Sequence, residues 1–184
     1  MKHHARHRNR VRISGGSHRG SILTFDDADG LRPTPDMVRQ KLFNWLGQEL
    51  HGQNVLDLFA GSGALGLEAA SRHAARVCLC DHNRRTVAAL HDNIRRLGLA
   101  QAHAVHSEAL AFLHTNRQRF DLVLLDPPFA WRGWQALFDA LRPHLADGAR
   151  VYAEAAQLPD FPEWLLPHRE SRAGQSRFVL LRRA

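Results

Sequence analysis

The stretch LDLFAGSGALGLE, residues 56–68, determines the fold. Its apolar beginning is typical of a strand that ends between Asp57 and Phe59, and Gly61, Gly63 and Gly66 follow in a G-x-G-x-x-G pattern. Glycine permits a tight turn and allows a ligand to approach the backbone. A strand, a glycine turn and a helix in this order predict a nucleotide-type ligand at the carboxyl end of the strand.

Two carboxylates indicate which ligand this turn binds. Asp57 lies just before the glycines, where it would repel a pyrophosphate but attract the ammonium group of a methionine moiety. Asp81 ends the next strand-like run and can accept hydrogen bonds from both ribose hydroxyls of an adenosine, which a dinucleotide would also need. We therefore predict S-adenosyl-L-methionine as the cofactor. Glu108 either contacts the adenine or is an ordinary acid in the first turn of a helix. The predicted cofactor-binding residues are Asp57, Phe59, Gly61, Ser62, Gly63, Asp81, Ser107, Glu108 and Ala109.

The sequence on both sides of this stretch predicts an α/β fold. The apolar runs NVLDLF, ARVCLCD, AHAVHS, FDLVLLD and ARVYAEA alternate with helical segments near 63–73, 83–97, 108–116 and 132–144. Such alternation predicts a mostly parallel sheet, here of about seven strands, with helices on both faces. The segment from about Trp164 to Arg182 reads as two strands joined by SRAGQS, a loop too short for a crossover helix, so an antiparallel C-terminal hairpin is expected.

The N-terminal third reads as an extension of this core. We predict a basic flexible arm over residues 1–12 and a single domain over 13–184, divided into a hairpin and helix (13–52) and the catalytic core (53–184). The helix is expected from Thr34, as N-cap, to about Leu50, with Pro35 at its first position.

The charge of the chain indicates a polyanionic partner. Its 184 residues carry 25 Lys+Arg against 18 Asp+Glu, a net charge of +7. Arginine binds phosphate bidentately and stacks on unpaired bases, which suits RNA, although a merely basic surface is the alternative. Many of the basic residues lie near the two ends of the chain, at Lys2, Arg6, Arg8, Arg10, Arg12, Arg19, Arg169, Arg172, Arg177, Arg182 and Arg183.

Neither a metal site nor a membrane segment is expected. Cys78 and Cys80 should be packed side chains on one face of a strand, and His3, His4 and His7 fit no zinc spacing. No apolar run approaches the roughly 18 residues that span a bilayer, so a cytoplasmic protein is expected.

The strand FDLVLLD leads directly into Asp126-Pro127-Pro128-Phe129, the predicted catalytic motif. Two prolines fix the backbone, so the Asp126 carboxylate and the Pro127 carbonyl are held beyond the sheet edge. Two fixed acceptors that bind both hydrogens of an exocyclic amine would free its lone pair for attack on a methyl group. Phe129 offers a flat face on which an extruded base can stack.

Several segments resemble a known family. Residues 59–68 and the tetrapeptide are similar to the cofactor loop and the signature of amino-methyltransferases with the Rossmann-like class I fold. RISGGSHRG (12–20), LRPTPDMVRQKLFNWL (31–46) and RAGQ (172–175) resemble the bacterial 16S rRNA guanine-N2 methyltransferases of the small ribosomal subunit, over nearly the whole chain. The resemblance implies a monomer that methylates a guanine within the 30S subunit or an assembly intermediate, with Asp126 and Pro127 orienting the amine. The residues predicted to bind substrate are Arg10, Arg12, Arg19, Arg32, Thr34 and Arg39.

Two other functions stay open at this point. An adenine-N6 methyltransferase would share the cofactor residues and the tetrapeptide, although 184 residues leave little room for a DNA-recognition segment. A non-catalytic RNA-binding assembly factor would keep the fold, but it would not need Asp126, both prolines and the glycine turn.

Overall fold

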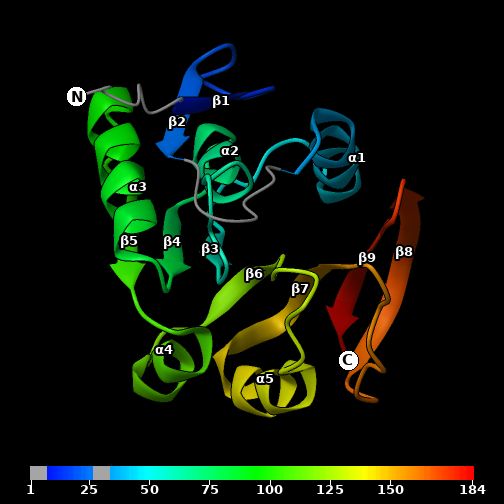
Figure 1. Ribbon diagram of the computed structural model, residues 1–184. Coiled ribbons are helices and arrows are strands. Elements are labelled where there is room, and N and C mark those ends of the chain that lie inside the picture. The colour runs from blue at the N-terminus through cyan, green and yellow to red at the C-terminus, as the bar shows by residue number, and fades with distance from the viewer. Residues whose placement is uncertain (1–7, 27–33) are drawn as a thin grey trace, which may run out of the picture.

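A seven-stranded sheet forms the centre of the molecule, with helices on both faces (Figure 1). The computed structural model describes residues 8–26 and 34–184. The strand order is β5-β4-β3-β6-β7-β9-β8, in which β5 to β7 run parallel and β9 is antiparallel to both neighbours. This confirms the predicted α/β fold with its antiparallel C-terminal hairpin. The strands of the sheet are β3 Asn54–Asp57, β4 Arg76–Asp81, β5 Ala102–His106, β6 Phe120–Leu125, β7 Leu145–Ala155, β8 Leu165–Ala173 and β9 Ser176–Arg183.

The helices divide between the two faces of the sheet, because successive strand residues point in opposite directions. Val55 of β3 belongs to a core shared with α1, α2 and α3, whereas Leu56 belongs to a core shared with α4 and α5. Cys78 and Cys80 are free and buried in the second core, which confirms that they are packed side chains. None of the described helices has the length and apolar character needed to cross a membrane. The helices are α1 Asp36–Leu46, α2 Gly66–Ser71, α3 Arg84–Leu97, α4 Ala109–Thr115, α5 Trp134–Leu141 and the short 3-10 helix Arg142–His144.

The order of the strands determines where a ligand can bind. From β3 the chain moves outward through β4 to β5, and then returns to the other side of β3 with β6 and β7. Open α/β sheets bind ligands at the carboxyl ends of the strands beside such a reversal. The ends of β3 and β6, at Asp57 and Asp126, lie at this position.

An N-terminal hairpin covers the face that carries α2 and α3 (Figure 1). Its strands β1 Arg8–Arg12 and β2 Ile22–Asp26 are antiparallel. The first strand therefore begins at Arg8, inside the segment predicted to be a flexible arm. This short strand is hard to recognise in the sequence because three of its five residues are Arg. Residues 1–7 lie outside the described part of the chain.

The turn of the hairpin rests on the end of α2. The backbone N–H of Ser17 donates to the carbonyl oxygen of Ser71 at 2.8 Å. Gly16 has φ +77°, and a Cβ there would lie 1.9 Å from the same carbonyl oxygen. Only glycine fits this contact, both for its backbone conformation and for the space available.

Helix α1 begins later than expected. Its first residue is Asp36, Pro35 is at the N-cap, and no side chain caps the helix. Thr34 is therefore not the N-cap. Its hydroxyl instead donates to Asp126, 92 positions further along the chain, at 2.9 Å. The apolar face of α1, with Val38, Leu42 and Phe43, is buried as its pattern predicts.

Candidate active site

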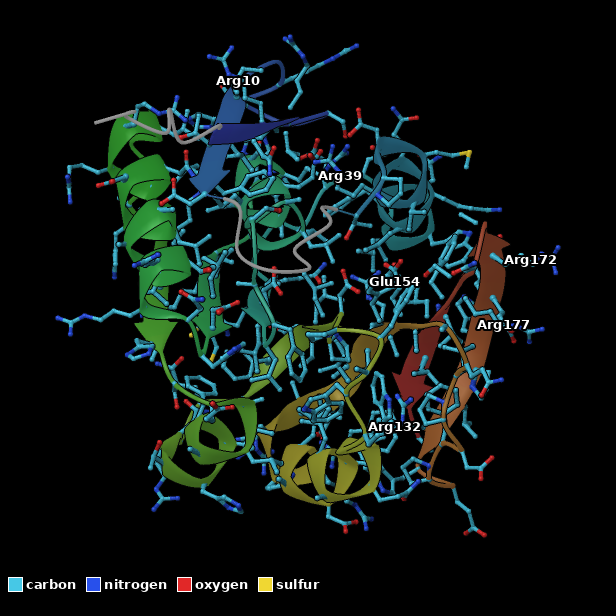
Figure 2. All side chains as sticks on the ribbon, viewed as in Figure 1. Arg10, Arg39, Arg132, Glu154, Arg172 and Arg177 are labelled. Carbon is cyan, nitrogen blue, oxygen red and sulfur yellow. The ribbon has the colours of Figure 1, made fainter. Side chains whose placement is uncertain are left out.

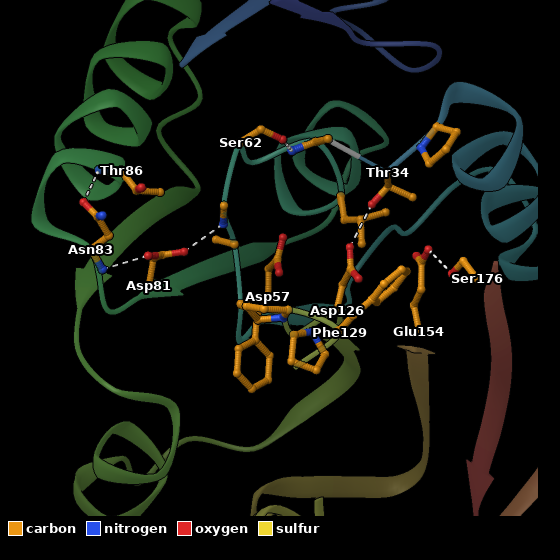
Figure 3. Close-up of a pocket in the computed structure, with 18 of the residues that line it drawn as sticks. Thr34, Asp57, Ser62, Asp81, Asn83, Thr86, Asp126, Phe129, Glu154 and Ser176 are labelled. Atoms are coloured by element: carbon orange, nitrogen blue, oxygen red, sulfur yellow. Dashed lines mark hydrogen bonds between the residues drawn. The ribbon is translucent and has the colours of Figure 1, made fainter. Parts of the chain in front are cut away.

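A cavity of about 890 Å³ opens at the carboxyl ends of β3, β4, β6 and β7. Figure 3 shows Asp57, Asp126 and Glu154 at the ends of neighbouring strands around one space. The glycine turn and the proline-locked acid thus share a single cavity, as direct methyl transfer requires. Its lining includes Thr34, Pro35, Asp57, Phe59, Gly61, Ser62, Asp81, His82, Asn83, Thr86, Asp126, Pro127, Pro128, Phe129, Glu154, Gln175 and Ser176.

The glycine turn fits between β3 and β4. Gly61 and Gly63 have φ +51° and +79°, in the left-handed region that favours glycine. A Cβ on Gly63 would lie 2.6 Å from Leu90 of α3, and one on Gly66 would lie 2.8 Å from Leu79 of β4. These contacts keep the turn close to the sheet. Gly63 and Gly66 shape the cavity without lining it.

Asp57 holds the turn with one oxygen and leaves the other free. Its Oδ2 accepts the backbone N–H of Gly66 at 2.9 Å. Its Oδ1 is buried and has no hydrogen-bond partner among the described residues. Burial, and to a lesser degree the charge of Asp81, raise the pKa of Asp57 to about 7. A buried acceptor without a donor is costly to the fold and points to a ligand that supplies one, which fits the ammonium group of S-adenosylmethionine.

Asp81 organises the next strand end. Its two oxygens accept the backbone N–H groups of Gly61 at 2.9 Å and Asn83 at 2.8 Å. Each oxygen keeps a second lone pair, so the carboxylate can still accept from ribose hydroxyls. Asn83 in turn accepts from Arg85 and Thr86 and caps α3. His82, Asn83 and Thr86 were not among the predicted site residues, although an Asn two residues after a strand-end acid is a recognisable helix cap.

The Asp-Pro-Pro-Phe segment forms the other wall. Asp126 Oδ2 accepts from Thr34 Oγ1, as described above. Burial and then the charge of Glu154 raise the pKa of Asp126 well above its usual range. Pro127 is buried, whereas Phe129 keeps 50% of its surface exposed at the cavity mouth. An exposed ring held in this place is available for stacking against a base.

Glu154 is a cavity residue that the sequence analysis did not single out. It lies near the end of β7, has 4% of its surface exposed, and accepts hydrogen bonds from Tyr152 Oη at 2.7 Å and Ser176 Oγ at 2.5 Å. The available signal was a lone acid in the apolar run ARVYAEA.

Other predicted site residues lie outside the cavity lining. Ser107 donates its backbone N–H to the carbonyl of Asp81 at 3.0 Å, and Glu108 occupies the N-cap position of α4, so neither they nor Ala109 reach the cavity in this structure. Glu108 thus precedes the first turn of α4, makes no side-chain cap hydrogen bond there and does not line the cavity. Arg10, Arg12 and Arg19 are exposed on the hairpin, and Arg32 lies outside the described residues.

Arg39 is not available to a substrate. Its side chain is fully buried, pairs with Asp36 and Glu68, and donates to the carbonyl of Arg12 at 2.9 Å. The prediction of a substrate contact was therefore wrong: this arginine fastens the hairpin to α1 and α2.

One group of potential metal ligands occurs among the described residues. Glu49, His51 and His73 are exposed and place ligand atoms within 4.8 Å of one another. None of them lines the cavity.

The strand order and the two facing walls of the cavity are those of a class I S-adenosylmethionine-dependent methyltransferase. The family model described as Conserved hypothetical protein 95 matches residues 11–182. Ribosomal RNA small subunit methyltransferase D of Escherichia coli K12 is 41% identical over 179 residues, which cover 94% of this chain and 90% of the relative. The chain belongs to this family, as its sequence motifs predict.

Solved structures agree with this assignment. A putative methyltransferase from Escherichia coli superposes with a TM-score of 0.87 at 38% identity, covering 95% of this chain and 98% of the other. A putative methylase from Haemophilus influenzae gives a TM-score of 0.80 at 31% identity, covering 95% and 99%.

Proposed function

We propose that this protein transfers a methyl group from S-adenosyl-L-methionine to the exocyclic N2 of a guanine in 16S rRNA of the small ribosomal subunit. The observation that carries the proposal is that Asp57 and the glycine turn share one cavity with Asp126 and Pro127. The name of the Escherichia coli relative supports the small-subunit RNA as substrate.

Different residues of the cavity would bind different parts of S-adenosylmethionine. Asp57 Oδ1 would accept a hydrogen bond from the ammonium group, Asp81 would accept from the ribose hydroxyls, and the glycine turn would let the cofactor approach the backbone. The bound cofactor supplies an electrophilic sulfonium methyl group.

Asp126 and the Pro127 carbonyl prepare the acceptor nitrogen. A base amine is a poor nucleophile because its lone pair is delocalised into the ring. Hydrogen bonds from both amine hydrogens to these two fixed acceptors draw the nitrogen toward tetrahedral geometry and offset the positive charge that develops on it. Thr34 positions the Asp126 carboxylate, and Phe129 stacks on the extruded base.

The arginines supply the contacts to the RNA backbone. Arg10 projects from the hairpin, and Arg172 and Arg177 project from the β8–β9 edge, on two sides of the cavity residue Glu154 (Figure 2). We infer that Arg10, Arg12 and Arg19 bind phosphates of the 30S subunit or an assembly intermediate, and that the protein acts as a monomer in the cytoplasm.

Incubation with tritiated cofactor tests the proposal. Undermethylated 30S particles, naked 16S rRNA and duplex DNA are offered in parallel, and the labelled nucleoside is identified after digestion. We expect N2-methylguanosine from the ribosomal substrates. Label in N6-methyladenosine, or only in DNA, would contradict the proposed reaction, and absence of label from all three would favour a non-catalytic assembly factor.

A further inference from the structure

Glu154 is a buried acid in the catalytic cavity that the transfer mechanism above does not use. Its carboxylate is 4% exposed and lines the cavity. Among the described residues no Lys, Arg or His forms an ion pair with Glu154 or Asp126. A buried acid without a counter-charge destabilises the fold, and a second acid beside it adds repulsion. Such a pair points to a ligand with several adjacent donors.

The sheet places the two acids side by side. Strands β6 and β7 are parallel neighbours, and Leu125 is in register with Ala153. The residues that follow are Asp126, directly after β6, and Glu154 of β7, so both carboxyl groups lie at the same end of the sheet. Figure 3 shows the two carboxyl groups beside each other in the cavity, and burial and then the charge of Glu154 raise the pKa of Asp126.

Two hydroxyls fix the direction of the Glu154 carboxylate. Tyr152 Oη donates to Oε2 and Ser176 Oγ donates to Oε1. Tyr152 stays protonated as a donor, because burial and the neighbouring acids raise its pKa well above the usual value. Each carboxylate oxygen therefore keeps acceptor capacity, and its orientation is set before a base enters.

The base edges differ at the atom next to the reactive amine. Guanine presents the N2 amine beside N1–H, so donors are adjacent. Adenine and cytosine present their amines beside a ring nitrogen that is an acceptor. An acceptor fixed next to the amine site therefore pairs with guanine and faces a lone pair on the other two bases. Enzymes that extrude a base read this Watson–Crick edge.

We propose that Glu154 accepts a hydrogen bond from N1–H of the target guanine, while Asp126 and Pro127 hold its N2 amine, and that Glu154 thereby selects guanine over adenine and cytosine. This inference rests on the proposed function and adds a base-specificity residue to it. The Asp-Pro-Pro-Phe segment alone leaves the identity of the base open.

The test exchanges donor and acceptor on both sides of this contact. Reconstituted small subunits carry either guanine or 2-aminopurine at the methylated position. 2-Aminopurine keeps the N2 amine but has an acceptor at N1. Single-turnover methyl transfer is measured for the wild-type protein and for Glu154→Gln, whose amide can donate to that acceptor.

We expect the wild type to prefer guanine by about 100-fold or more, because a site built for a donor rejects a base that lacks it. Glu154→Gln should lose guanine activity by a similar factor and favour 2-aminopurine relative to the wild type.

The outcomes separate this inference from the reaction itself. A wild type that methylates guanine and 2-aminopurine within about threefold overturns the role of Glu154, and so does a Glu154→Gln variant that loses the same factor on both bases. Wild-type label on adenine would overturn the proposed function and this inference together, whereas label on guanine without a change of preference would overturn only the inference.

Two further variants control for folding. Glu163→Gln changes an exposed acid outside the cavity lining and should leave both rates unchanged. If Glu154→Gln fails to fold, Ser176→Ala replaces it, since this change keeps the acid and removes one of its two donors. It should lower the preference for guanine by about tenfold. An unchanged preference would contradict the proposal.

Discussion

At the scale of single residues, the site depends on acids that burial makes reluctant to ionise. Asp57 has the clearest case, because one of its oxygens has no described partner and its pKa is raised to about 7. At a pH between the ordinary pKa of 3.8 and the raised pKa, Asp57 is protonated in the folded, cofactor-free protein but ionised in the unfolded chain. The stability of the cofactor-free protein therefore falls as the pH rises from about 4 to 7.

Cofactor binding should also depend on pH through the ionisation of Asp57. The ammonium group pairs with ionised Asp57, so binding below pH 7 must release a proton. We expect the affinity for S-adenosylmethionine to rise by up to about tenfold per pH unit between pH 5 and 7. Calorimetric titration in buffers of different ionisation enthalpy measures both the affinity and the released proton. Asp57→Asn should bind more weakly and lose this pH dependence, and a flat profile in the wild type would refute the assignment.

Asp126 should affect turnover far more than cofactor binding. In the proposed reaction its carboxylate holds the amine of the base, so Asp126→Ala would remove an acceptor that the transition state needs. We predict a fall in kcat of about 100-fold or more, with little change in the dissociation constant of the cofactor. Single-turnover rates and equilibrium titration separate the two quantities. An equal loss in both would place Asp126 on the cofactor instead.

At the scale of elements, a buried charge network joins the hairpin, α1 and α2. Glu68 of α2 is fully buried and accepts from Arg72 Nε at 3.0 Å and from Ser14 Oγ at 2.8 Å. Arg39 of α1 reaches the same carboxylate at 3.5 Å. This network places α1, and with it Thr34, above the catalytic strand end.

Removal of the central charge should loosen all three elements. Glu68→Gln leaves two buried guanidinium groups without their shared counter-charge, so we expect the free energy of unfolding to fall by about 3 kcal/mol. Urea denaturation gives this value. Glu49→Gln, which alters an exposed acid in the segment after α1, is the matched control and should change stability by less than about 0.5 kcal/mol. Equal effects of the two substitutions would show that the network contributes little.

At the scale of the whole molecule, basic surface surrounds an acidic cavity. The net charge of +7 coexists with Asp57, Asp81, Asp126 and Glu154 in a single pocket. In the proposed function this division separates two tasks: the exposed arginines would attract the phosphate backbone, and the acids of the cavity would accept hydrogen bonds from the cofactor and the base.

The affinity for RNA should fall steeply as salt rises. Each neutralised phosphate contributes a slope of roughly 0.7 to 0.9 in a plot of log affinity against log salt. Replacement of Arg10, Arg12 and Arg19 by Gln should reduce this slope by about 2 to 3 while cofactor affinity stays constant. Replacement of Arg117 and Arg119 by Gln serves as the control. These two arginines are exposed just before β6, at the amino end of that strand, whereas the cavity lies at the carboxyl ends. Equal effects from both sets would refute a specific role of the hairpin.

The order of strands and helices and much of the site were predictable from local patterns. The glycine spacing and the paired prolines determine the local backbone whatever surrounds them. Gly61, the acids after the strands and both prolines meet in one cavity. The errors concern contacts between distant segments. Arg39 is predicted to bind substrate but is buried and pairs with Glu68, and Thr34 is predicted to cap the helix but donates its hydroxyl to Asp126.

The sequence by itself determined the fold class, the glycine turn and the proline-fixed end of β6, because periodicity, glycine and proline act over a few residues. Only the tertiary structure decided which side chains meet around the cavity. Glu154 lies beside Asp126 because β7 pairs in parallel with β6. Ser176 can donate to Glu154 because β9 pairs with β7. Burial also raises the pKa of Asp57 and Asp126. Strand pairing and burial depend on the packing of the complete chain, so no short stretch of residues encodes them.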